Sequence, residues 1–264
     1  GIGRRQRQMC IRDSNNIFIK AVARNGIDIA SGISNTKVLK TIIQKIVNIY
    51  DVNTNINILT TILTKAVELN ITETTNDSDT IDIIANLEVN MRRNIGLTSD
   101  HGYNGTSTIY TDYLANYKYN TIEIAYHHAI VTAIINITTS ISGYATYDDC
   151  ITALANKFTS VPGTDTLIDT DISGTYIDYN NIYTTVGAIL GESKFYASSM
   201  ILYAQKISQL INEQLESGTD NLTKLINIEK IVAYTKRYSL MESSQDINAL
   251  TFANIDSVCL LYTS

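Results

Sequence analysis

The chain has 264 residues, a net charge of −6, 44% hydrophobic residues and a single proline. This length suits one large or two small domains, and the ordinary apolar content excludes a disordered chain. The acidic balance argues against sequence-independent binding to nucleic acid, which needs clustered Lys and Arg side chains. No apolar run is long enough to span a bilayer, so we expect no membrane span.

The two ends of the chain carry a complementary pattern at the DNA level. The segment from Gln8 to Asp13 can be encoded by the string AGATGTGTATAAGAGACA, which runs into the next codon, and the segment from Cys259 to Ser264 by its reverse complement. Two unrelated termini do not encode complementary DNA by chance, and the string resembles a transposase-type sequencing adapter. We therefore expect residues 1–13 and 259–264 to be translated adapter. The native part, residues 14–258, is then a fragment, as metagenomic DNA yields.

Leaving out the expected adapter residues changes the net charge and the number of cysteines. Four arginines and Asp13 are lost, so the net charge falls from −6 to about −9, and the basic N-terminal run no longer indicates a nucleic-acid arm. Of the three cysteines only Cys150 remains, which excludes an internal disulfide framework and a multi-cysteine metal site. Acidic neighbours of Cys150 are expected to raise the pKa of its thiol.

The first half of the chain shows helical spacing after a short apolar segment, residues 17–22, and a turn near Gly26 and Gly32. Asn35 is a candidate N-cap for a helix through Tyr50, since apolar residues recur there every three or four positions. The same spacing continues over residues 54–69 and 80–95. The first two of these segments are expected to form an antiparallel helix pair. The Gly-rich stretch 96–106 is the point at which the domain could divide, and a tyrosine-dense helix is expected over residues 107–119.

The stretch from Thr121 to Ile141, TIEIAYHHAIVTAIINITTSI, is the centre of the predicted fold. As a helix it presents apolar side chains on two opposite sides, which is typical of a helix buried between others. Helices are also expected over residues 147–158, within 179–216 and over 221–241, with a long irregular connection at 159–178. The sequence therefore predicts an all-α bundle of about seven or eight helices in antiparallel pairs around a central buried helix.

Two weak metal-site patterns stand out. Residues 169–180 resemble an EF-hand-type calcium loop up to Thr175: oxygens at the first, third and fifth positions and a glycine at the sixth precede a predicted helix. The pattern then departs, because Asn180 stands where a bidentate Glu is expected, and the alternative is an Asp-rich turn that caps the next helix. The candidate calcium ligands are Asp169, Asp171, Ser173, Thr175 and Asn180.

The second pattern is Glu123 and His127, one helical turn apart, which could ligate zinc or iron with further ligands from His101, Asp148 or Asp149. The simpler interpretation is a buried pair in which Glu123 orients His127, and His128 lies on another face of the helix. A catalytic signature is not found.

Tyrosines are concentrated between residues 103 and 126, and tyrosine is enriched at protein interfaces. The sequence therefore favours a non-enzymatic structural or assembly protein, such as a virion or surface component. It is expected to bind protein partners, either itself or other subunits. The alternative is a calcium- or metal-dependent binding module that uses the 169–180 loop. No cofactor is expected, with calcium as the exception. An enzyme centred on Glu123 and His127 is the third and least favoured hypothesis.

Overall fold

The computed structural model describes residues 7–10, 18–24, 26–27, 34–35, 37–44, 56–72, 75–95, 109–110, 121–140, 146–159, 198–238 and 249–259. Within these ranges the chain is mostly helical, with seven helices and little strand. The helices are α1 (Ile58–Asn70), α2 (Asp77–Asn94), α3 (Thr121–Ser140), α4 (Tyr147–Thr159), α6 (Ser198–Glu216), α7 (Asn221–Tyr238) and α8 (Phe252–Cys259). The described part of the chain is therefore mostly helical, which is consistent with the predicted all-α fold.

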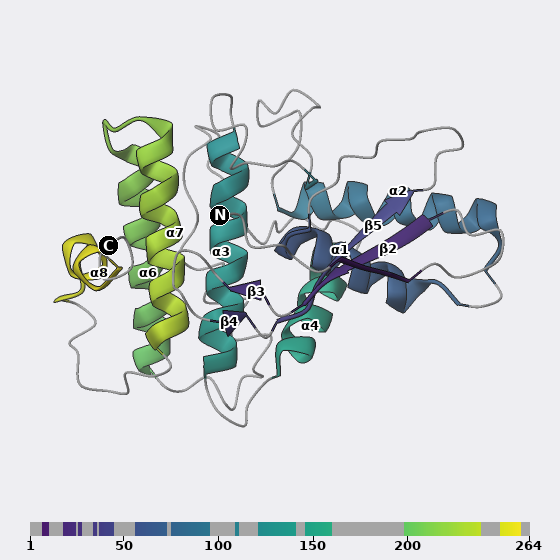
Figure 1. Cartoon of the computed structure of the whole chain (residues 1–264), viewed down its shortest axis with the longest axis horizontal. Helices are drawn as coiled ribbons and strands as arrows, with labels where there is room; N and C mark the ends of the chain where they lie inside the picture. The colour runs from purple at the N-terminus through teal and green to yellow at the C-terminus, as the bar shows by residue number, and fades with distance from the viewer. Residues whose placement is uncertain are drawn as a thin grey trace.

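Helix α3 lies between two groups of the other described helices. It contacts α6 and α7 on one side and α1 and α4 on the other, and lies between these two groups in Figure 1. Its described side chains are buried, apart from the partly exposed Thr132 and Thr139. A helix apolar on both sides must be enclosed, because either side left in water would forfeit the free energy of burying it. The described part of this stretch is therefore a buried helix in contact with four other helices.

The first helix expected from the sequence, over residues 35–50, is wrong. Leu39–Gln44 is strand β5, and it pairs antiparallel with β2 (Phe18–Ala23), which also pairs with β1 (Arg7–Cys10). Asn35, the expected N-cap, instead lies in β4 (Ser34–Asn35), paired with β3 (Gly26–Ile27). Thr41, Ile42 and Ile43 are β-branched residues in succession, which favours a strand once another strand is available as a partner. The expected antiparallel helix pair is therefore a strand followed by a helix.

Helix α1 starts later than expected, at Ile58, because Asn57 caps it. The Asn57 side chain accepts a hydrogen bond from the Thr60 backbone N–H at 2.8 Å, and the Thr60 hydroxyl is 2.9 Å from the Asn57 N–H, which completes a capping box. The apolar face expected for this helix is buried. Three threonines on its other sides, Thr60, Thr61 and Thr64, are buried as well. Helix α1 is thus enclosed almost as fully as α3.

Two of these threonines bond to strand β5, at the edge of the sheet. The Lys40 backbone N–H donates to the Thr61 hydroxyl at 2.9 Å, and the Thr60 hydroxyl donates to the Lys40 carbonyl at 2.9 Å. These contacts satisfy edge groups that would otherwise be open to another strand. The helix therefore closes one edge of the three-stranded sheet, whose order is β1-β2-β5.

Removing one threonine hydroxyl should show how far the fold depends on these bonds between α1 and β5. Thr61→Val is expected to lower the free energy of unfolding by about 1–3 kcal/mol, because it leaves the half-buried Lys40 N–H without its acceptor. Thr64→Val is the matched control, since the Thr64 hydroxyl bonds only within its own helix, to the Thr60 carbonyl at 2.7 Å. Urea unfolding measures both variants. Equal losses for the two would show that the bond to β5 contributes nothing.

Helices α2, α4, α6 and α7 follow the predicted pattern where the structure describes them, whereas α8 was not expected from the sequence. Ile84, Leu87, Met91 and Ile95 of the α2 segment are buried, as expected from their spacing. Helices α6 and α7 lie side by side and are joined by the turn at residues 217–220 (Figure 1). The Asp220 carboxylate accepts from the Leu222 and Thr223 N–H groups at 3.0 and 3.1 Å, so Asp220 is the N-cap of α7. The predicted helix over 107–119 and the connection at 159–178 lie outside the described residues, apart from a turn at 109–110 and the end of α4.

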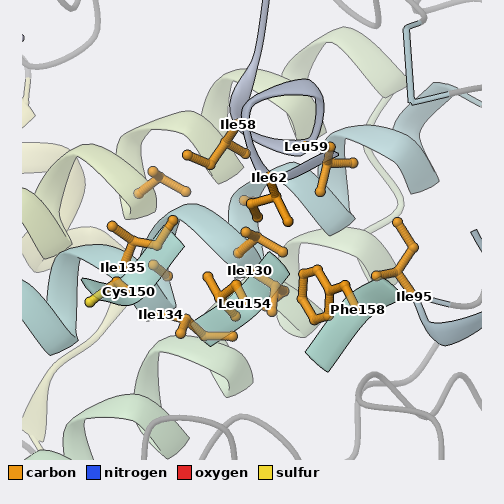
Figure 2. Close-up of a cluster of buried hydrophobic side chains, with 14 of the residues drawn as sticks. Ile58, Leu59, Ile62, Ile95, Ile130, Ile134, Ile135, Cys150, Leu154 and Phe158 are labelled. Atoms are coloured by element: carbon orange, nitrogen blue, oxygen red, sulfur yellow. The ribbon is translucent and has the colours of Figure 1, made fainter. Parts of the chain in front are cut away.

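The apolar core joins the two groups of helices through α3. Side chains of α1, α3 and α4, together with Ile95 beyond the end of α2, meet in one cluster, shown in Figure 2. The labelled residues are Ile58, Leu59, Ile62, Ile95, Ile130, Ile134, Ile135, Cys150, Leu154 and Phe158. Within the described ranges, no helix is both long and apolar enough to cross a bilayer.

Candidate functional site

The polar side chains buried on α3 are the first place to look for a functional site. Tyr126, His127, His128 and Asn136 are each at most 6% exposed, although they lie in the most apolar part of the fold. Buried polar groups are costly unless hydrogen-bonded, so their contacts indicate what they do.

Two of these residues connect α3 to neighbouring helices. The Tyr126 hydroxyl lies 3.1 Å from Asn212 Oδ1 on α6, and Asn136 Nδ2 donates to Thr235 Oγ1 on α7 at 3.0 Å. The Thr235 hydroxyl in turn donates to the Val232 carbonyl at 2.6 Å. Each bond joins a side chain of α3 to one on a different helix. A shift of α3 by one helical turn would break both, so these pairs specify how the helices pack.

Asn136 also receives a hydrogen bond from the N-terminal part of the chain. Lys37 Nζ donates to Asn136 Oδ1, and the same ammonium lies 5.6 Å from the centre of the Tyr147 ring on α4. The Asn136 amide is therefore held at both ends, by a lysine before β5 and by a threonine of α7. This arrangement connects three parts of the chain that lie about a hundred residues apart in sequence.

The contact between Asn136 and Thr235 can be tested by removing one hydroxyl. Thr235→Val is expected to lower the free energy of unfolding by about 1–3 kcal/mol, because Asn136 Nδ2 stays buried and loses its acceptor. Thr132→Val is the matched control, since Thr132 lies on the same central helix and is partly exposed. Chemical denaturation of both variants measures the difference. A loss below about 0.5 kcal/mol for Thr235→Val would contradict a structural role for the bond.

His127 and His128 are adjacent in sequence and are both buried on α3. Burial, followed by the charge of His127, lowers the pKa of His128 to about 3. The His127 ring packs edge-on against Tyr126, with ring centres 5.7 Å apart and planes at 63°. His128 is thus neutral throughout the physiological range. It does not have the near-neutral pKa that acid–base catalysis favours.

The structure does not assemble the predicted zinc or iron site from the residues it describes. Glu123 and His127 both lie on α3, but the Glu123 side chain is outside the described residues, as is His101. Asp148 lies at the surface in an ion pair with Lys65 at 3.0 Å. Asp149 accepts from the Thr146 N–H and hydroxyl at 2.9 and 2.7 Å, which caps α4 and lowers the pKa of Asp149.

Asp148 and Asp149 therefore both lie at the surface, at the start of α4, where Asp148 forms an ion pair and Asp149 caps the helix. Among the described residues, no three His, Cys, Asp or Glu side chains lie close enough to hold a metal ion. The calcium-loop candidates Asp169, Asp171, Ser173, Thr175 and Asn180 all lie outside the described residues.

Cys150 is buried at the base of α4 and forms no disulfide. Burial raises the pKa of its thiol to about 11, Lys37 opposes this effect, and Asp149 adds to it. The predicted direction of the shift is confirmed, but burial is the main cause rather than the acidic neighbours. The protonated thiol is a poor nucleophile at neutral pH.

The side chains in this region thus hold helices together, and sequence reasoning missed the most connected of them. Asn136 and Thr235 carry no recognisable motif, and Lys37 precedes a strand that the spacing assigned to a helix. The only available signal was that Asn136 interrupts an otherwise apolar helix, where a lone polar residue needs a partner. Family models, curated proteins and solved structures were compared with the chain, and none gave a significant match.

Proposed function

We propose that this protein is a non-enzymatic structural or assembly protein, of the kind found in virions or on cell surfaces, which works by binding other protein chains. The observation that carries the proposal is that the buried polar groups on α3, and the buried thiol on α4, take part in packing. Tyr126 and Asn136 bond to other helices, His128 is held neutral, and Cys150 is held as a thiol. These features favour stable packing over chemistry.

Exposed apolar side chains give further support. Leu222 and Ile226 are one helical turn apart on α7 and are 43% and 46% exposed, so they form a small apolar patch at the α6–α7 end of the protein. Apolar residues that are adjacent on a surface are more typical of interaction sites than single ones. Leu69, on α1, is equally exposed at 47% and provides a matched single residue.

Sedimentation velocity tests the proposal. The chain is expected to associate as its concentration rises, and the double variant Leu222→Glu, Ile226→Glu is expected to associate at least about tenfold more weakly, because charge in a contact surface opposes burial. Leu69→Glu should associate like the unmodified chain. A protein that remains monomeric at all concentrations would contradict assembly with further copies of itself through this patch.

A second function, calcium-dependent binding, is favoured by one sequence observation: oxygen-bearing residues at four ligand positions of the 169–180 loop, with Gly174 at the sharp turn. Calcium that binds only to the folded state must stabilise it and so raise the melting temperature. At a calcium concentration ten times the dissociation constant, the free energy of unfolding rises by about 1.4 kcal/mol. The rise should disappear in the variant Asp169→Ala, Asp171→Ala. An unchanged melting temperature in millimolar calcium would remove this function.

A further inference from the structure

The outer side of α7 is covered along only part of its length. Leu222, Ile226 and Lys230 follow one another at intervals of four residues, so they form one row on the surface of the helix. At the far end of this row, Lys230 Nζ donates to Asp256 Oδ1 of α8 at 2.6 Å. At the near end, next to the turn at residues 217–220, Leu222 and Ile226 are exposed. The row therefore begins as an open apolar patch and ends at a helix.

Helix α8 shows what this side of α7 binds. Its Ile255, with Leu250 just before the helix, is buried in the same apolar cluster as Ile231 of α7. Helix α8 lies on the side of α7 away from α3 (Figure 1), and α7 is the described helix that it contacts most. Its eight residues extend about 12 Å, whereas the 18 residues of α7 extend about 27 Å, so α8 cannot cover the whole row. The surface that binds α8 therefore continues, uncovered, as the Leu222–Ile226 patch.

The end of the α6–α7 pair that carries this patch is acidic. Glu213, Glu216 and Asp220 are exposed, and they lie in the last turn of α6 and in the turn to α7. The cation nearest to them in sequence is Lys224, whose Nζ is directed to the Leu215 carbonyl and donates to it at 2.7 Å. A cationic partner is therefore favoured at this end, because opposite charges around a contact steer binding and like charges oppose it.

We propose that the Leu222–Ile226 patch is the docking site for a basic amphipathic helix of a partner protein, which lays its apolar side on α7 next to α8. Two observations select this partner: α8 already packs further along the same row, and the carboxylates at this end attract cations. A second copy of α8 fits less well, because α8 carries Asp256 and no cation. The inference rests on the proposed assembly function and assigns it a partner chemistry.

Fluorescence anisotropy with designed peptides tests the site on the full chain. The probe is a fluorescein-labelled peptide with leucines at helical spacing and lysines elsewhere, about 15 residues long because shorter helices are marginal in water. The matched probe has the same composition in scrambled order, so it keeps the charge and loses the apolar stripe. The helical peptide is expected to bind at least about tenfold more tightly than the scrambled one. Equal binding of the two would show that charge alone is recognised, and would overturn the site.

Variants of the chain locate the site. The double variant Leu222→Ala, Ile226→Ala should bind the helical peptide at least about tenfold more weakly, because two apolar side chains are lost from the contact. Leu69→Ala, at an equally exposed position of α1, should bind it like the unmodified chain. Asp256→Ala should leave binding unchanged, since the partner helix lies next to α8 and does not replace it. Tighter binding in Asp256→Ala would mean that the peptide displaces α8, and unchanged binding in the double variant would place the peptide elsewhere; either result overturns the proposal.

The partner chemistry and the assembly function are tested separately. A peptide with glutamate in place of lysine should bind at least about tenfold more weakly, and equal binding would overturn the basic partner. Sedimentation velocity without peptide measures self-assembly. A monomeric chain that binds the helical peptide supports this inference while self-assembly fails. A chain that self-associates through the patch but does not bind the peptide has a second copy as the occupant, which overturns the inference.

Discussion

Replacing Ile130 with alanine is expected to lower the free energy of unfolding by about 2–5 kcal/mol. Ile130 is 0% exposed and lies on α3 within the cluster formed with α1 and α4 (Figure 2). The substitution removes apolar contacts and leaves a cavity that packed helices on both sides of α3 cannot fill by moving together. Denaturant unfolding at neutral pH measures the loss, which is a large part of the stability of a domain of this kind.

The control for this prediction lies on the same helix. Thr132→Ala also truncates a β-branched side chain to alanine, but at a partly exposed position of α3, so its effect is expected to stay within about 0.5 kcal/mol. The comparison separates burial from helix propensity, because alanine favours a helix at both positions. An Ile130→Ala variant as stable as the Thr132→Ala variant would place that side of α3 in solvent.

Acid should destabilise the fold well above the pH at which carboxylates titrate. The pKa of His128 is about 3 in the folded state and 6.5 when exposed. Below pH 6.5 the unfolded chain therefore binds a proton at His128 that the folded chain does not bind. The free energy of unfolding should fall by about 1.4 kcal/mol per pH unit from pH 6 downward, and the contribution of His128 levels off near pH 3. Urea unfolding between pH 7 and 4.5 measures this slope.

One variant tests whether His128 causes this pH dependence of stability. His128→Gln removes the titrating group and should flatten the dependence between pH 6.5 and 4.5. Asp149 and Asp220, whose pKa values are lowered by hydrogen bonds from Thr146 and Thr223, stabilise the fold above pH 3.8 and lose this effect only below it. An unchanged slope in His128→Gln would show that His128 is not the group that resists protonation.

Much of the helical part of the fold could be predicted because burial there follows helix periodicity. In α3 apolar residues occur on both sides, and such a pattern has one stable solution, enclosure by other helices. The turn between α6 and α7 was predictable because Ser217, Gly218 and Asp220 give the chemistry of a helix end and a helix start.

The sheet could not be predicted by the same means. Residues 39–44 carry apolar doublets that fit helical spacing, and only pairing with β2, a long-range interaction, decides in favour of a strand. The threonines of α1 were missed for a related reason. Their burial depends on the backbone of β5, which the spacing had assigned to a helix.

The candidate site was less predictable than the fold. Glu123 and His127 attract attention because their side chains can bind metals, yet the contacts that the structure shows involve Asn136, Thr235 and Lys37. Amide and hydroxyl pairs have no characteristic spacing, since their partners come from distant segments. The calcium-loop hypothesis for residues 169–180 stays a prediction that the titration above tests.

Hydrogen exchange along α3 tests the central claim, that this helix is enclosed on both sides by the rest of the protein. The amides of residues 125–137 are expected to exchange most slowly of all the described segments, and only through global unfolding. The exposed turn at residues 217–220 should exchange fastest and serves as the internal reference. Exchange of residues 125–137 at the rate of that turn would contradict the account.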